Sequence, residues 1–440
     1  MKKILFSLLA AMTVLTATAA DREHTLKIYN WADYIDFNVL EEFKTWYTEQ
    51  TGEPIDIIYN TFDINENMLT EIEIGKEDYD VICPSEYIIE RMLKRDLLLP
   101  IDKSIIPDSI NYFKLVAPFA TEKFQQMAPT SDINVADYAV GYMWGTTGFL
   151  YNAAYVQPEE VSSWGAINNV ERFAGRILMK DAFRDVYSVI ILYAYRDEIA
   201  RGEVTRDELI SHITPERIAR VEEILMAGKE CYAGWEVDFG KEEMTKGKTW
   251  LDLMWSGDAQ WAIDETEGTD VELHYIVPKE GSNVWFDGWC IPRYAVNTKA
   301  ATYFMDYMCR PDNAILNMEE IGYVSVIASP EIEAWAEDET IEETADLTYF
   351  FGPKAKAVHV NQVFYPDQSV IDRCALMHDA GQQAEALMQM WNRVKGDNLN
   401  TRMLIIIGVV VAAIVVLICV QFIGRRRQRD LQIKKKNKRK

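Results

Sequence analysis

The sequence has few of the residues that build disulfide frameworks. Six of its 440 residues are cysteine, and five of them lie outside the apolar C-terminal run, without metal-like spacing: Cys83, Cys231, Cys290, Cys309 and Cys374. An odd set of five permits at most two disulfides. Cys83 and Cys290 lie in apolar, strand-like runs, so we expect both to be buried as small hydrophobic side chains.

Histidine is also scarce, and no catalytic pattern is present. The five histidines are scattered along the chain: His24, His212, His274, His359 and His378. No pair of them has the spacing of a helical metal site, and no nucleophile-elbow pattern occurs. The sequence therefore predicts no cofactor, no metal and no enzyme activity.

Basic residues are outnumbered by acidic ones, 45 against 69, which leaves a formal net charge of −24. Ten of the basic residues lie in residues 424–440 beside a single Asp, so the rest of the chain is more acidic still. A field of that sign disfavours nucleic acid and anionic ligands and concentrates cations near the surface. An acidic surface that only keeps an exported domain soluble explains the charge equally well.

Both ends of the chain carry membrane signals. A lysine pair, an apolar run and small residues in succession predict a signal peptide over residues 1–20. Residues 403–423 contain no charge and as a helix would span roughly 31 Å, enough to cross a bilayer. The basic residues 424–440 follow directly and are expected to stay in the cytoplasm. We therefore expect a periplasmic or extracytoplasmic body, anchored to the cytoplasmic membrane by one C-terminal transmembrane helix.

The N-terminal part alternates between strand and helix patterns. Strand-like runs occupy residues 26–31, 55–60 and 79–83, and apolar residues at helical spacing fill the intervals. This βαβαβ order predicts an α/β fold with a parallel sheet. Ligands of such sheets bind beyond the carboxyl ends of the strands. Four side chains follow those ends: Trp31, Tyr34, Ser85 and Tyr87.

A second α/β region follows without a flexible linker. Residues 142–145 are expected to cross between the regions, and residues 284–330 repeat the pattern of the first. Two crossings predict two discontinuous lobes with a hinge and an interlobe cleft that closes on its ligand. We expect lobe one to comprise residues 21–140 with 284–333, and lobe two to comprise residues 141–283 with 334–398.

Aromatic residues stand beside acids at several places, most clearly in Trp285-Phe286-Asp287. Indole and phenol faces attract an ammonium group. A carboxylate accepts the N–H donors of that group with charge assistance. The combination is typical of a site for an organic polycation whose methylene groups lie against the rings.

Six motifs occur in an order that resembles the bacterial polyamine-binding proteins, the receptors of spermidine/putrescine ABC transporters. They are Asn30-Trp31-Ala32-Asp33-Tyr34, Cys83-Pro84-Ser85-Glu86-Tyr87, residues 181–186, Trp255-Ser256-Gly257-Asp258, Trp285-Phe286-Asp287 and Ile321-Gly322-Tyr323. The resemblance covers nearly all of residues 25–395 and implies a type II periplasmic-binding-protein fold whose lobes close over an extended amine. The implied partners are a polyamine, permease subunits and the inner membrane, with a monomeric ectodomain.

The resemblance also implies which residues bind the ligand. The set comprises Trp31, Tyr34, Ser85, Tyr87, Asp185, Trp255, Asp258, Trp285, Asp287 and Tyr323. Asp287 matches the acid that takes an amine in the cleft, and Asp185 matches a family glutamate. Asp258 stands where putrescine-type members place a further carboxylate.

The sequence departs from the family pattern at three places. Asp185 is one methylene shorter than the family glutamate, and Met377 falls where spermidine binders can place a glutamine. With Asp258, these departures favour a short diamine such as putrescine and leave spermidine open. The membrane span is the third departure, because soluble or lipid-tethered receptors are more usual.

Other interpretations remain open from the sequence alone. A membrane-tethered sensor of polyamines would use the same site, and a carboxylate-pair glycosidase would use Asp258 and Asp287 as acid and base. Purely structural roles are also available: Trp255 and Trp285 in the core, Tyr34 in a turn, and Asp258 as a helix cap.

Overall fold

The computed structural model describes residues 22–106 and 111–396. The chain divides after Leu387 into two compact units, and the following description concerns the first, apart from helix α19, which continues past Leu387. Within the described ranges, no helix is long and apolar enough to cross a membrane. The predicted signal peptide, transmembrane helix and basic tail all lie outside the described residues.

A parallel sheet forms the N-terminal part, as predicted. Strand β1 (Thr25–Trp31) pairs in parallel with β2 (Asp56–Phe62) and with β3 (Val81–Ile82). Helix α2 (Phe37–Thr51) connects β1 to β2; the Asp36 side chain caps its start and Gly52, at φ 74°, ends it. Strand β3 is shorter than the predicted run at both ends, and on its carboxyl side Pro84 has no N–H to donate to a ladder.

Two long antiparallel strands, β5 (Ala139–Asn152) and β10 (Ser282–Pro292), are buried along their whole length. Their register shifts between Phe286 and Gly288. At this irregularity Asp287 leaves the ladder with β5 and forms an isolated bridge with Ser85. The bulge therefore turns Asp287 toward Ser85, which directly precedes helix α4 (Glu86–Lys94).

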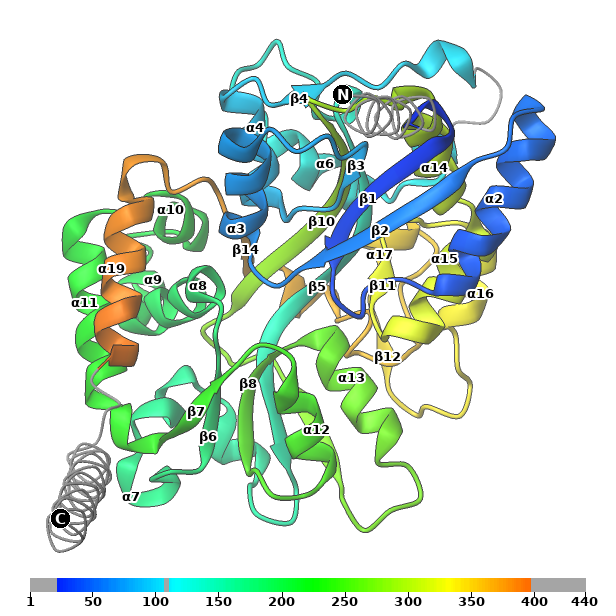
Figure 1. Cartoon of the computed structure of the whole chain (residues 1–440). Coiled ribbons are helices and arrows are strands. Elements are labelled where there is room, and N and C mark those ends of the chain that lie inside the picture. The colour runs from blue at the N-terminus through cyan, green and yellow to red at the C-terminus, as the bar shows by residue number, and fades with distance from the viewer. Residues whose placement is uncertain (1–21, 107–110, 397–440) are drawn as a thin grey trace, which may run out of the picture. The chain divides into compact units, whose positions relative to one another are not determined.

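Strand β5 joins two parts of one sheet, whose strand order is β2-β1-β3-β10-β5-β8-β6-β7. Its first half pairs with β10, and its second half pairs with β8 (Leu251–Trp255) and β9 (Leu273–Ile276). Beyond β8, strand β6 (Ile177–Lys180) pairs in parallel with β7 (Tyr232–Glu236). Figure 1 shows β5 and β10 running between these two parts of the sheet. Residues 142–145, predicted as a crossing segment, lie within β5.

The other strands are short: β4 (Leu98–Leu99), β11 (Val324–Ser325), β12 (Thr344–Ala345), β13 (Val358–His359) and β14 (Cys374–Leu376). The other helices are α3 (Asn65–Thr70), α5 (Asn111–Leu115), α6 (Pro118–Gln126), α7 (Val170–Phe173), α8 (Phe183–Ala194), α9 (Arg196–Ala200), α10 (Arg206–Ser211), α11 (Pro215–Ala227), α12 (Phe239–Thr245), α13 (Ser256–Glu265), α14 (Thr298–Met308), α15 (Pro311–Ile321), α16 (Pro330–Ala336), α17 (Thr348–Phe351), α18 (Gln368–Ile371) and α19 (Ala384–Gly396).

Aromatic side chains fill the core beside the two long strands. Trp144 of β5 stacks on Phe286 of β10 at 6.0 Å between ring centroids, and on Phe350 of α17 at 5.4 Å. The five cysteines in the described part of the chain are free and buried. The predicted burial of Cys83 and Cys290 is therefore confirmed, and no disulfide links these five residues.

The turn before β10 depends on Gly281, which generates a first prediction. Gly281 has φ +101°, and a Cβ there would lie 1.9 Å from the carbonyl oxygen of Arg373. Gly281→Ala should lower the free energy of unfolding by about 3 kcal/mol or more, since backbone strain and a clash with backbone add. Urea unfolding followed by circular dichroism measures the loss.

Gly202→Ala is the matched control. Gly202 also has positive φ, +70°, but open space surrounds its missing Cβ, so its cost should be about 1 kcal/mol of strain alone. Equal losses for the two variants would show that the approach of Arg373 does not constrain this turn.

Candidate ligand-binding site

Asp287 lies at the centre of the site and is 6% exposed. One carboxylate oxygen accepts a hydrogen bond from the Tyr34 hydroxyl at 2.8 Å, and the other accepts one from the Ser85 hydroxyl at 2.7 Å. Ser85 precedes α4 but does not cap it with its side chain, and its oxygen accepts in turn from Asn65 at 3.0 Å. Two hydroxyls from distant segments, one of them positioned by Asn65, thus hold one carboxylate.

The environment of Asp287 disfavours the ionised carboxylate. Burial raises the pKa of Asp287 from 3.8 to about 7, the donors Ser85 and Tyr34 lower it in part, and the nearby Asp185 raises it. These donors are neutral, so no positive charge from them balances the carboxylate. A cation bound beside Asp287 would supply that balance and favour its ionised form.

Aromatic rings surround this carboxylate. Tyr323 packs edge-on against Tyr34, with ring centroids 5.2 Å apart, and against Trp285, with centroids 5.4 Å apart. Trp31, at the end of β1, meets Trp255, at the end of β8, edge-on at 6.3 Å. Trp31 and Trp255 are partly exposed, whereas Tyr34, Trp285 and Tyr323 are buried.

Asp185 forms a second acidic position in the first turn of α8, whose N-terminus favours a negative charge. Helix α8 begins at Phe183, two residues before Asp185. The Asp185 carboxylate accepts from Asn283 at 2.9 Å and from the Trp255 indole. Burial raises the pKa of Asp185, although both donors oppose the shift.

Asp258, the third predicted acid, already has a cationic partner. Its carboxylate lies 3.0 Å from the ammonium of Lys180, the last residue of β6. Asp258 stands in the first turn of α13, but the N-cap residue is Trp255, so Asp258 is not that helix's cap. The Tyr323 hydroxyl also hydrogen-bonds to Asp258, which links this end of the site to the rings around Asp287.

Tyr87 connects through its hydroxyl to the same network. That hydroxyl accepts from Asn65 at 3.2 Å and donates to Glu66 at 3.3 Å. The buried guanidinium of Arg184 lies 5.2 Å from the Tyr87 ring centroid. Tyr87 is therefore placed beside both a cation and an acid.

The structure brings all ten predicted residues together through direct contacts or one intervening side chain. Their roles in binding a ligand stay predictions. A purely structural role of Tyr34 in a turn does not account for its hydroxyl, which donates its hydrogen bond to Asp287 and not to the local backbone.

Several polar residues that support the site were missed from the sequence: Asn65, Glu86, Lys180, Glu236 and Asn283. Lys180 carried a signal, because a lysine directly after an apolar strand stands at a carboxyl end, where binding groups gather. Glu86 is fully buried and accepts from the Phe286 N–H at 3.1 Å, which ties β10, next to Asp287, to the start of α4. Glu236 carried none.

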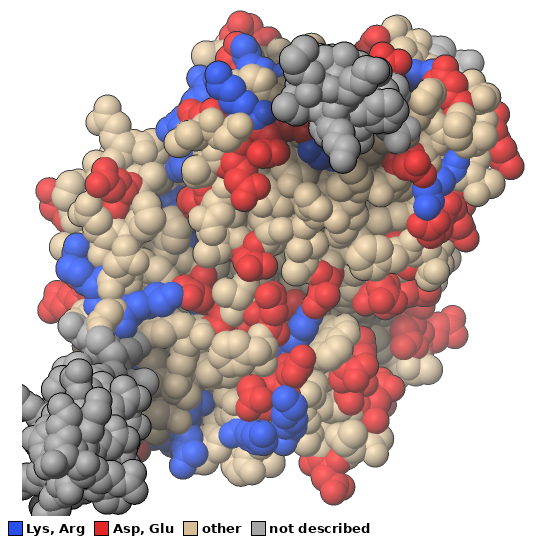
Figure 2. All heavy atoms as spheres, viewed as in Figure 1, with Lys and Arg blue, Asp and Glu red and all other residues tan. Residues whose placement is uncertain are grey.

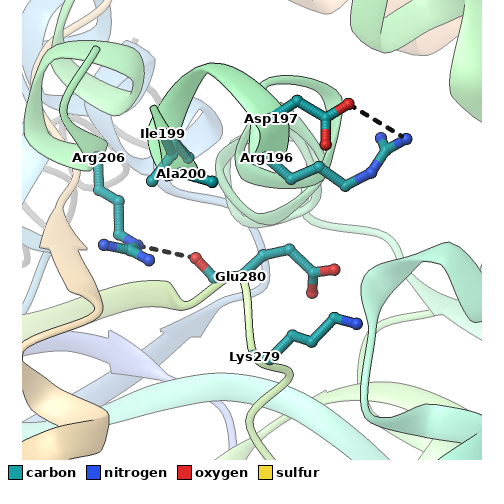
Figure 3. A pocket seen from close by; sticks show the side chains of 7 residues that line it. All are labelled: Arg196, Asp197, Ile199, Ala200, Arg206, Lys279 and Glu280. Carbon is teal, nitrogen blue, oxygen red and sulfur yellow. Dashed lines mark hydrogen bonds and ion pairs between the residues drawn. The ribbon is translucent and has the colours of Figure 1, made fainter. Parts of the chain in front are cut away.

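A surface pocket of about 360 Å³ lies elsewhere, between α9, the start of α10 and residues 279–280. Figure 3 shows Arg206 donating to the Glu280 carbonyl oxygen and Arg196 paired with Asp197. The pocket shares no residue with the predicted site.

Acidic side chains also mark the surface. Figure 2 shows Asp and Glu gathered across the middle of the visible face, with fewer Lys and Arg among them. This distribution agrees with the formal net charge of −24 and would draw cations toward the molecule.

Fold and site together indicate a receptor for a small cationic solute. The profile of the family described as bacterial extracellular solute-binding protein matches residues 42–343. The chain belongs to this family, whose members are receptors rather than enzymes. Individual relatives within the family resemble this chain more specifically.

The spermidine/putrescine-binding periplasmic protein of Escherichia coli strain K12 is 30% identical over 356 residues, which cover 79% of this chain and 92% of the relative. The putrescine-binding periplasmic protein PotF of the same strain is 26% identical over 338 residues, which cover 74% of this chain and 84% of the relative. The solved structure of the spermidine/putrescine ABC transporter substrate-binding protein PotD of Streptococcus pneumoniae superposes with a TM-score of 0.61 at 27% identity. The superposition covers 84% of this chain and 98% of the PotD chain. The chain thus has a type II periplasmic-binding-protein-like α/β fold.

The raised pKa of Asp287 generates a prediction for the unliganded protein. Because the folded chain holds the Asp287 proton more strongly than the unfolded chain, this carboxyl lowers the stability progressively as pH rises from about 4 to about 7. As pH rises from 5 to 7, the free energy of unfolding of Asp287→Asn should therefore increase relative to that of the natural chain by about 2 kcal/mol. Urea unfolding at several pH values measures the difference. Parallel stability curves would mean that Asp287 ionises normally.

Proposed function

We propose that this protein is the extracytoplasmic receptor of an ABC importer, and that it captures putrescine or spermidine and delivers it to the permease. The observation that carries the proposal is the Asp287 carboxylate, buried among rings and held by two neutral hydroxyls. An organic ammonium provides both the missing charge and the N–H donors that this arrangement lacks.

The rings suit the rest of such a ligand. The Trp31 ring offers cation–π attraction to an ammonium group, and Trp255 and Trp285 offer apolar contact to the methylenes between the ammonium groups. An amine bound here would lose its hydration, so each ammonium requires a counter-ion in the site. Asp287 and Asp185 are the carboxylates that we assign to this role.

The lobes and the anchor belong to the same proposal. Lobe one, residues 21–140 with 284–333, and lobe two, residues 141–283 with 334–398, would close on the amine about a hinge. Residues 403–423 would form a transmembrane helix that tethers the receptor to the periplasmic side of the inner membrane. A tether of this kind raises the effective concentration of the receptor near its permease.

The relatives support the amine as the ligand, since their names specify spermidine and putrescine. The glycosidase interpretation has less support, because it needs Asp258 and Asp287 as a free acid pair. The carboxylate of Asp258 is instead ion-paired with Lys180 at 3.0 Å. A sensor role would use the same binding event and require a partner subunit for signalling.

Isothermal titration of the full chain in detergent tests the proposal. Putrescine or spermidine should bind, whereas amino acids and neutral sugars should give no heat. Asp287→Asn should weaken amine binding by about 3 kcal/mol, roughly a hundredfold, because an ammonium would be buried without its counter-ion. If neither putrescine nor spermidine binds, the proposed ligand class is refuted.

Asp306→Asn is the matched control for that variant. Asp306 of α14 is also buried, and burial raises its pKa to about 6, but its partner is Asn111 and not a site residue. This variant should keep the amine affinity of the natural chain. Equal loss in both variants would mean that the effect reports folding and not the site.

A further inference from the structure

The buried lysine Lys180 stands in surroundings that match those expected for a ligand ammonium. Its side chain is fully buried, and its ammonium lies 4.0 Å from the centroid of the Trp255 ring. Carboxylate oxygens of Asp258 and Glu236 lie 3.0 and 3.1 Å away, and the Val237 carbonyl accepts a hydrogen bond. The Lys180 ammonium, a cation of the protein itself, is thus surrounded by one aromatic face, two carboxylates and a carbonyl.

The charge of Lys180 is stable in this position. Burial alone lowers the pKa of Lys180, but Glu236, Asp258 and Asp252 outweigh that effect and raise it above the usual value. Lys180 therefore remains a fixed positive charge at this end of the site.

A ligand cannot use the same partners while Lys180 holds them. The face of Trp255 that Lys180 covers is closed to a second ammonium, and like charges at such short range repel strongly in a poorly solvated site. Of the three predicted acids, only Asp287 and Asp185 make no ion pair with a protein cation within the described residues.

We propose that Lys180 is a specificity-determining residue whose ammonium replaces a third ligand ammonium, so that the site accepts a diamine and rejects a triamine. This inference rests on the proposed function and deepens it, because it assigns the number of charges on the ligand. Two ammonium groups remain to be neutralised, by Asp287 and Asp185. Lys180 thus shortens the site at the Trp255 end.

The test compares putrescine with spermidine on the full chain in detergent by isothermal titration. The natural chain should bind putrescine at least tenfold more tightly than spermidine, and an equal or reversed preference would overturn the proposal. Lys180→Met keeps the length and apolar stem of the side chain but removes its charge. It should shift the preference toward spermidine by at least tenfold, because Asp258 and the Trp255 face become available.

Lys27→Met is the matched control. Lys27 of β1 also lies near an aromatic ring, 5.0 Å from the centroid of Tyr79, and pairs with Asp78, but it contacts none of the ten predicted site residues. It should leave both affinities unchanged. A folded Lys180→Met variant with the natural preference would overturn the inference and leave the receptor function standing.

Failure of the two proposals can be told apart. If the natural chain binds neither amine, the proposed ligand class is wrong and the assignment of Lys180 falls with it. If Lys180→Met does not fold, as circular dichroism would reveal, the preference of the natural chain still decides the inference.

Discussion

A buried carboxylate without a cationic partner is the constraint on which this site depends. Asp287 reaches its place because β10 bulges there, and it stays there because the Tyr34 and Ser85 hydroxyls each donate to one oxygen. Burial raises the pKa of this carboxyl to about 7, and the two neutral donors, which bring no positive charge, lower it only in part. The unliganded site therefore carries an electrostatic cost that a bound cation removes, and this difference supplies affinity.

The buried carboxylates at the two ends of the site have different counter-charges. At the Asp287 end, the ligand supplies the positive charge. At the Trp255 end, the ammonium of Lys180 already occupies the position between Asp258, Glu236 and the indole face. A protein cation in that place costs no binding entropy when the ligand arrives, and it restricts which ligands fit. The acidic surface in Figure 2 attracts amines in general, whereas the internal lysine distinguishes among them.

Much of the fold was accessible from the sequence, because it rests on local signals. Alternating strand and helix patterns located β1 and β2, and the parallel pairing follows from their order. The ten candidate residues came from the ordered motifs, and the structure joins them by direct contacts or through one intervening side chain. The ion pair of Lys180 with Asp258 could not be read in this way, since 78 positions separate the two residues. The bulge at Asp287 likewise depends on its bridge to Ser85, a contact between distant segments that no local pattern encodes.

The most direct test of the central claim measures protons exchanged when an amine binds. Putrescine is titrated into the full chain at about pH 6 in two buffers whose protonation enthalpies differ. Asp287 is mostly protonated in the free protein at that pH and must ionise to pair with an ammonium. The account predicts release of about one proton per bound amine. Binding with no proton release would contradict it, because the amine would then have found its counter-ion elsewhere.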